Sequence, residues 1–116
     1  MEKELTIDGI VYKLGRYDFG TDVEINDRAI ALQFNEEKKE VIPVPKAGIM
    51  SFLMVFYAIK SWTFRGMNDG ELITDTTVNI LPITEENLKK IPSKHGNMLT
   101  KLSSELNGVN DKTAKN

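Results

Sequence analysis

Few residues of this sequence have the types and spacing that catalysis requires. His95 is the single histidine, and an imidazole base would need a nucleophile within hydrogen-bond reach. Ser103 and Ser104 follow in the same segment, but without the glycine-flanked turn that exposes a nucleophilic serine. The pattern around His95 therefore favours a solvent-facing side chain over a catalytic one.

The carboxylates do not form an acid–base or metal motif either. The acidic pairs at 36–37 and 85–86 lie in charged or helix-starting segments, where no apolar surroundings would raise a carboxyl pKa. Asp69, Glu71 and Asp75 lie near one another in sequence, but their spacing does not match a calcium-binding loop. We interpret them as solvated carboxylates of a turn.

Other chemistries lack their residues altogether. The chain has no cysteine, which excludes disulfides, thiolate nucleophiles and cysteine-based zinc sites. The two glycines of "GRYDFG", residues 15–20, have the wrong spacing for a nucleotide-binding loop. The net charge is −2 and the basic residues are scattered, whereas nucleic-acid binding needs a basic stripe. We expect no enzyme, cofactor, metal or nucleic-acid partner.

The most apolar stretch is "KAGIMSFLMVFYAIKSWTF", residues 46–64. Its uncharged run has 13 residues, from Ala47 to Ile59, whereas a membrane-spanning helix needs about 20. Apolar residues point in every direction around a helix, which predicts a central helix that is buried on nearly all sides and ends shortly before Gly66. Two alternatives stay open: the core of the domain, or a helix covered by a second copy or another protein. Membrane insertion is not expected, and the N-terminus shows no secretory signal.

The N-terminal segment predicts a β-hairpin. Asp8-Gly9 is a dipeptide typical of a type I′ turn, and apolar residues alternate on both sides of it. The expected cross-strand pairs are Glu4 with Lys13, Leu5 with Tyr12, and Ile7 with Ile10. Farther along, "VEI" (23–25) and "RAIALQF" (28–34) are interpreted as two short strands. Ile30, Leu32 and Phe34 are expected to face inward, residues 35–40 to form a charged turn, and "VIPVP" (41–45) to be extended.

The C-terminal half predicts two amphipathic helices. Thr84 is a good N-cap for a short helix that stops before Pro92. Ser93 is the expected cap of the last helix, and Gly108 suits its C-terminus. The apolar stripe of this helix is Met98, Leu99, Leu102 and Leu106, opposite Lys101, Ser104 and Glu105. Between the central helix and Thr84 we expect a turn at Asp69-Gly70 and an extended segment or edge strand at 72–80.

Strands first and helices later indicate an α+β fold. In it, the N-terminal hairpin and short antiparallel strands pack on the central helix, and the two amphipathic helices follow. We expect one domain, residues 1–108, and a disordered tail, residues 109–116.

The second half of the chain resembles the small tail assembly chaperones and related tail-module proteins of long-tailed bacteriophages. The resemblance rests on "AIKSWTFRGMNDGEL" (58–72) and "LPITEENLKKIPSKHGNMLTKLSSELN" (81–107). In these proteins an aromatic-ended helix with a W-x-F element leads into an acidic glycine turn, and a threonine-capped helix precedes a leucine-rich one. The segment "ITDTTVNIL" departs from the pattern by inserting residues between the turn and the capped helix.

The resemblance implies a non-enzymatic protein of the bacterial cytoplasm that binds the tape-measure protein and tail-tube subunits during tail assembly. Apolar and aromatic side chains would form the contact surface, and Trp62, at the expected helix end, is the foremost candidate. The expected partner-binding residues are Phe52, Phe56, Trp62, Phe64, Met98, Leu102 and Leu106. A virion subunit, such as a head–tail connector or minor tail protein, and a host regulatory or inhibitor domain stay open as alternatives, as does self-association.

Overall fold

The structure is a computed structural model that describes residues 2–108. For residues 31–34, Pro43 and Pro45 it describes the backbone alone. The predicted disordered tail, 109–116, lies outside the described residues. Antiparallel strands precede and flank the helices in an α+β fold, which confirms the predicted fold class.

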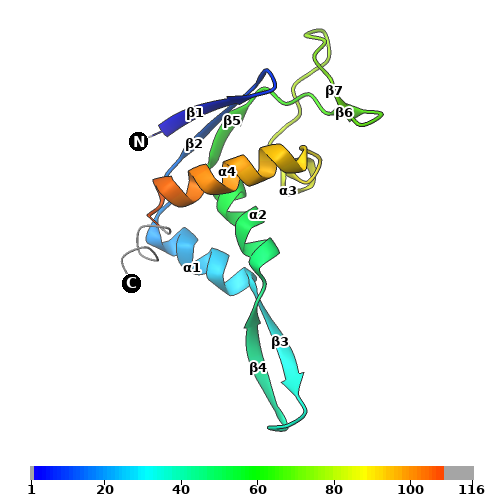
Figure 1. Cartoon of the computed structure of the whole chain (residues 1–116). Helices are drawn as coiled ribbons and strands as arrows, with labels where there is room; N and C mark the ends of the chain where they lie inside the picture. Colours follow the sequence, from blue (N-terminus) through cyan, green and yellow to red (C-terminus); the bar gives the residue numbers. More distant parts are fainter. Residues whose placement is uncertain (1, 109–116) are drawn as a thin grey trace.

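A three-stranded antiparallel sheet lies at the top of the molecule in Figure 1. In spatial order its strands are β1 (Glu2–Ile7), β2 (Ile10–Gly15) and β5 (Ile59–Trp62). Asp8 and Gly9 join the first two at φ values of 51° and 82°, the positive values that a type I′ turn requires. The register is the predicted one, with Glu4 opposite Lys13, Leu5 opposite Tyr12, and Ile7 opposite Ile10.

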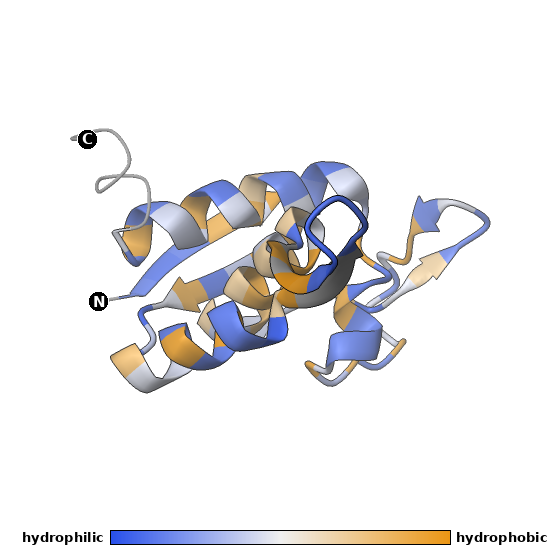
Figure 2. Cartoon of the chain, turned by 90° about the horizontal axis from the view of Figure 1, so that it is seen from below, coloured by the Kyte–Doolittle hydropathy of each residue, from blue (hydrophilic) through white to orange (hydrophobic). Residues whose placement is uncertain are grey.

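The core lies between this sheet and two helices, α2 (Ala47–Ala58) and α4 (Ser93–Leu106). The helices pack on each other and against β2. Tyr12 and Leu14 of β2 and Leu99 of α4 are fully buried there. The helix that leads to the grey C-terminal trace in Figure 2, α4, carries both hydrophobic and hydrophilic stretches, as expected for a helix with one buried face. Helix α2, in contrast, has no charged residue. The core therefore joins the two ends of the chain.

The central helix is confirmed, but its predicted end is wrong. α2 stops at Ala58, and Ile59 has an extended backbone (φ −72°, ψ 128°) and begins β5. The free edge of β2 offers backbone partners there: the Thr63 amide donates to the Val11 carbonyl over 3.0 Å. Burial is also less complete than expected, because the first turn, 47–49, is exposed.

The predicted strand at 23–25 is wrong, because these residues lie in helix α1 (Phe19–Arg28). The Asp18 side chain caps this helix by accepting a hydrogen bond from the Thr21 amide over 2.8 Å. Only Ile25 is buried within α1, and Ala29 follows it. A single buried position per helix leaves a weak periodic signal in the sequence.

Strands β3 (Ile30–Asn35) and β4 (Glu40–Pro45) form a separate two-stranded hairpin. We call it the arm. It projects from the C-terminal end of α1 and the N-terminal end of α2, away from the rest of the molecule (Figure 1). With the arm included, the structure measures 57 × 33 × 22 Å. The charged turn predicted at 35–40 is present but spans 36–39, because Asn35 and Glu40 belong to the strands, and the extended segment at 41–45 is confirmed. Ile30 was expected to face inward, but it is 46% exposed. The side chains of Leu32 and Phe34 lie outside the described part.

The segment between β5 and α4 covers one end of the core. It holds a small hairpin, β6 (Met67–Asn68) and β7 (Glu71–Leu72), and helix α3 (Glu85–Leu88). Asp69-Gly70 forms the predicted turn, and the Thr84 hydroxyl caps α3 by accepting from the Asn87 amide over 3.0 Å. The extended segment expected at 72–80 contributes only its first residue to a strand.

Candidate functional site

The residues expected to bind a partner do not gather on one surface. Trp62, Phe64 and Leu106 are buried in the core, at 5%, 0% and 6% exposure. Four others are half-buried or exposed on two helices. On α2 these are Phe52 and Phe56, and on α4 they are Met98 and Leu102.

Trp62 was expected at a helix end beside polar residues, and this placement is wrong. It ends strand β5, and its indole nitrogen donates to the Leu81 carbonyl over 2.7 Å. Its ring packs edge-on against Tyr12 and Phe64, with centroid distances of 6.4 and 5.4 Å. These contacts give Trp62 a role in the core.

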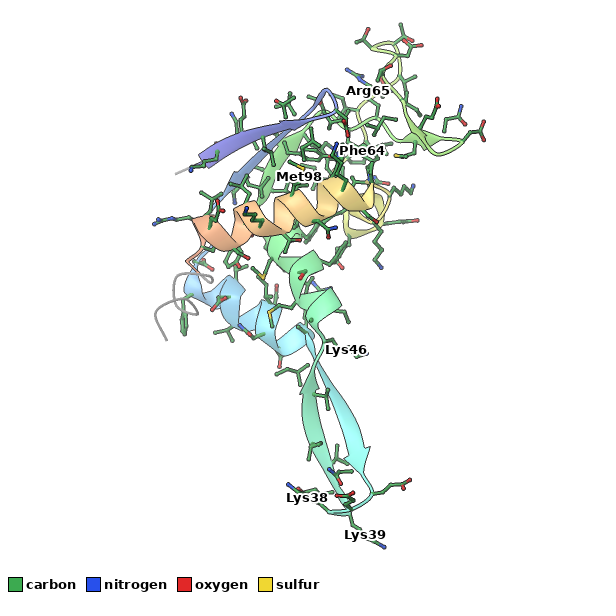
Figure 3. All side chains as sticks on the ribbon, in the orientation of Figure 1. Lys38, Lys39, Lys46, Phe64, Arg65 and Met98 are labelled. Carbon is green, nitrogen blue, oxygen red and sulfur yellow. The ribbon has the colours of Figure 1, made fainter. Side chains whose placement is uncertain are left out.

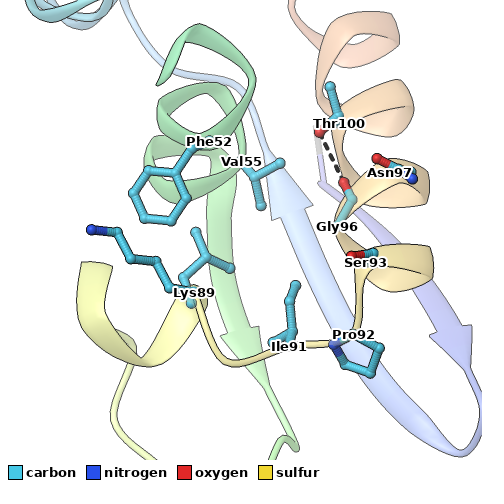
Figure 4. A pocket seen from close by; sticks show the side chains of 10 residues that line it. Phe52, Val55, Lys89, Ile91, Pro92, Ser93, Gly96, Asn97 and Thr100 are labelled. Atoms are coloured by element: carbon cyan, nitrogen blue, oxygen red, sulfur yellow. Dashed lines mark hydrogen bonds between the residues drawn. The ribbon is translucent and has the colours of Figure 1, made fainter. Parts of the chain in front are cut away.

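A cleft lies where α2, α3 and α4 meet, and Figure 4 shows it from close by. Its volume is about 240 Å³, and we call it the α2–α4 cleft. Phe52 and Val55 line one wall, and Gly96 and Thr100 line another. The Lys89 ammonium lies 5.6 Å from the centre of the Phe52 ring, within the range of a cation–π contact. The remaining lining residues are Leu88, Ile91, Pro92, Ser93 and Asn97.

Met98 and Leu102 line a second hollow with Leu5 of β1. Lys101 and Glu105 lie at its polar side, and its volume is about 310 Å³. Met98, labelled on α4 in Figure 3, is 39% exposed. The predicted stripe of the last helix therefore divides into a core part and an open part. Ser104 was expected on the solvated face, but it is buried at 7% exposure.

The expected solvent-facing position of His95 is wrong, because this side chain is fully buried at 0% exposure. Its Nε2 lies 2.9 Å from a carboxylate oxygen of Asp8, and its Nδ1 lies 2.8 Å from the Tyr12 hydroxyl. An ionised carboxylate only accepts, so Nε2–H donates to Asp8. In the neutral imidazole Nδ1 is then the acceptor, and the Tyr12 hydroxyl donates to it.

The three side chains form a network whose electrostatics follow from its geometry. The hydrogen bond from His95 lowers the pKa of Asp8, with Lys94 at 3.5 Å as a further influence. Burial raises the pKa of Tyr12, and the Asp8 charge adds to this effect. A tyrosine, histidine and aspartate in series could relay a proton. However, Tyr12 is 0% exposed, so its hydroxyl cannot meet a substrate in this structure. The network fixes the Asp8-Gly9 turn to the start of α4.

Sequence reasoning missed two exposed apolar features. On α1, Phe19 is 80% exposed and Val23 is 52% exposed. On the arm, Val41 is 59% exposed. The arm also presents charged residues, with Lys38 and Lys39 at its tip and Lys46 at its base (Figure 3). The Asp18 cap and the acidic residue Asp22 in the first turn were the signals that would have identified α1.

Among residues 2–108, no three histidine or acidic side chains gather where they could hold a metal ion, and this includes the carboxylates of 69–75. The same part of the chain has no helix with the length and apolar character needed to cross a bilayer. Comparison with protein-family models, curated proteins and solved structures found no match.

Proposed function

We propose that this chain is a non-enzymatic assembly protein of the tail assembly chaperone kind. In this role it binds the tape-measure protein and tail-tube subunits in the bacterial cytoplasm while a phage tail is built. The observation that supports the proposal most is the arm, a projecting hairpin that the rest of the described chain leaves uncovered.

The arm has the properties of a protein-binding element. Its two strands have six residues each, and neither pairs with a third strand in the described part of the chain. A two-stranded hairpin is marginally stable in water by itself. The unpaired edge of β3 also presents backbone donors and acceptors that can pair with another chain, whereas Pro43 and Pro45 of β4 offer carbonyl acceptors but no N–H donors. A partner would therefore stabilise the arm while the arm binds it.

The exposed side chains of the arm suit a protein client. Ile30 near its base and Val41 near its tip are 46% and 59% exposed. Binding of a client would remove their apolar surface from water, which is favourable. The charges of 36–40 are of both signs, so a client of either net charge could approach. An extended client segment could add to an edge of the arm through backbone hydrogen bonds, with side chains giving specificity.

The buried polar network also supports a binding role. Asp8, His95 and Tyr12 are engaged with one another, and the Tyr12 hydroxyl has no access to solvent. The open hollows beside Phe52 and Met98 are lined largely by apolar side chains. A bound partner protein could cover such apolar surfaces.

A virion subunit is the second candidate, and the same arm favours it. An arm that reaches a neighbouring copy could link subunits into a ring by head-to-tail contacts. The two candidates differ in what they bind. A chaperone should form a complex with a tape-measure fragment, whereas a virion subunit should form rings with copies of itself through the arm.

The test is Val41→Asp in a calorimetric titration with fragments of the tape-measure protein encoded in the same genome. We expect affinity to fall tenfold or more, about 1.4 kcal/mol, because a charge would replace an apolar contact. Val78→Asp is the matched control, since Val78 is 37% exposed but lies outside the arm, and it should bind like wild type.

Equal affinity of Val41→Asp and wild type would remove the arm as the contact. If the wild-type chain binds no fragment, and light scattering shows rings of the chain alone that Val41→Asp abolishes, the virion subunit becomes the preferred function.

A further inference from the structure

Phe19 and Val23 form an apolar ridge on α1, which we call the α1 ridge. They are one helical turn apart, so they lie on the same face of the helix. Their exposed fractions, 80% and 52%, are among the largest of the apolar residues in the described chain. Large exposed apolar groups on one face are typical of a contact site.

The α1 ridge is flanked by negative charge. With 100° per residue, Asp22 and Asp27 lie on either side of Phe19 and Val23 around the helix. Arg28 is the only basic residue of α1, and it bonds the Glu85 carboxylate over 2.9 Å. This pairing lowers the pKa of Glu85. The ridge therefore presents apolar side chains between carboxylates.

The α2–α4 cleft is also apolar, but the charge beside it is positive. Its lining is mainly apolar, and Lys89 lies on its wall. Lys90 follows it and is exposed; both lysines come directly after α3, which itself carries the exposed carboxylate of Glu86. The cleft volume of about 240 Å³ is several times the ~30 Å³ share of one water molecule. A side chain could therefore enter it.

The α1 ridge cannot reach the cleft of its own molecule. The Arg28–Glu85 bond places α3, and with it the cleft, beside the C-terminal end of α1. Phe19 lies nine residues earlier in the same helix, which is roughly 13 Å along its axis. In Figure 1 the beginning of α1 and the α3 helix lie on opposite sides of the molecule.

We propose that the α1 ridge of one copy docks into the α2–α4 cleft of a second copy, with Phe19 entering the cleft and Asp22 facing Lys89. Matching apolar surfaces and opposite charges on one chain favour a second copy as the occupant over an unrelated partner. Because the two surfaces differ, the contact is head-to-tail and can continue from copy to copy. This inference does not depend on the function proposed above.

The test is sedimentation velocity of the chain alone across a range of concentrations. Wild type should show larger species as concentration rises. Phe19→Ser should weaken this association by about thirtyfold or more, the effect of a buried aromatic hot spot. Ile80→Ser is the control, because Ile80 is 44% exposed elsewhere, and it should associate like wild type.

Gly96→Leu should block the cleft from the other side. Apart from its chain neighbours and the backbone of its own helix, no atom lies within 4 Å of the place where a Cβ would stand at Gly96, and leucine favours a helix more than glycine does. The variant should therefore fold but fail to associate. A mixture of the two variants should form a dimer and nothing larger, because Gly96→Leu still has its ridge and Phe19→Ser still has its cleft.

Charge reversal tests the pairing of the two surfaces. Asp22→Lys and Lys89→Glu should each weaken association, and a mixture of the two single variants should recover it in part. Wild type that stays monomeric at every concentration would overturn the proposal. Association that persists unchanged in both Phe19→Ser and Gly96→Leu would overturn it too, and would place the contact elsewhere, such as on the arm. No client protein takes part, so failure here leaves the titration of the proposed function unaffected.

Discussion

Two hairpins whose strands have equal lengths lie in different surroundings in this molecule. The β1–β2 hairpin and the arm each have two strands of six residues. The first is joined by β5 and covered by α4, so that Ile7, Ile10 and Tyr12 are buried. The arm gains neither a third strand nor a covering helix within the described chain. Strand length thus says little about stability, which comes from what covers the strands.

The sequence of the arm has features that restrict which other chains can pair with its exposed strand edges. Pro43 and Pro45 lie in β4 opposite Leu32 and Ile30. Proline cannot donate a ladder hydrogen bond, so it is found on edge strands. Together with the charges of the turn, it limits indiscriminate pairing with other chains.

Trp62→Ala should have the largest effect and tests the covered hairpin. Trp62 packs on Tyr12 and Phe64 and donates a hydrogen bond to the Leu81 carbonyl. We expect the free energy of unfolding to fall by about 3–5 kcal/mol, as measured by urea denaturation. A loss below about 1 kcal/mol would mean that Trp62 is not a core residue, and the contrast between the two regions would fail.

Tyr12→Phe should have the next largest effect. The ring would remain in the core, but the buried Nδ1 of His95 would lose its donor, at a cost of about 1–3 kcal/mol. Tyr57→Phe is the control, since the Tyr57 hydroxyl accepts from Arg28 at the surface, and it should change stability by less than about 0.5 kcal/mol. Equal losses in the two variants would contradict a special role for the buried network.

The dependence of stability on pH should reveal the Asp8 end of the network. The His95 hydrogen bond lowers the pKa of Asp8 below its usual 3.8, so the folded protein binds this proton less readily than the unfolded chain does. The stabilisation is therefore complete above about pH 3.8 and is lost as the pH falls through the lowered value. Asparagine tolerates the positive φ of the turn, so Asp8→Asn should fold, and its stability should not show this decrease at low pH.

Melting temperatures of wild type and Asp8→Asn, measured from about pH 5 to about pH 2, check this expectation. The advantage of wild type should shrink as the pH falls. A constant difference across this range would show that Asp8 ionisation does not contribute.

Val41→Asp should have the smallest effect on stability. Val41 is 59% exposed, and substitutions at such surface positions usually change the free energy of unfolding by less than about 0.5 kcal/mol. Urea denaturation beside Trp62→Ala gives the direct comparison. A loss of several kcal/mol in Val41→Asp would show that the arm is covered within the chain after all.

The covered hairpin was the part most open to prediction from sequence. Asp8-Gly9 and the alternation around it fix the turn type and the register together, so local chemistry was sufficient. The Thr84 cap and the Asp69-Gly70 turn were predicted for the same reason. Signals of this kind depend on neighbours in sequence, which are available without the fold.

The candidate sites could not be predicted in this way, because their character depends on tertiary burial. Trp62 and His95 are buried by segments far away in sequence, and the residues next to them give no signal that predicts this burial. The change from helix to strand at Ile59 likewise follows from the free edge of β2. Conversely, Phe19 is exposed because α1 buries only its opposite side, so an apolar residue type predicted nothing about its surroundings.

The hydrogen bond between Tyr12 and His95 joins residues 83 positions apart, and it has a consequence for synthesis. At ~5–20 residues per second, roughly 4 to 17 s separate the translation of the two residues. During this interval the last helix has not been synthesised, so the apolar face of the first hairpin is not yet covered by it. The chain can complete its core only after its final helix has been synthesised. A truncated product that ends before Ser93 should therefore expose apolar surface, aggregate readily and be sensitive to proteolysis.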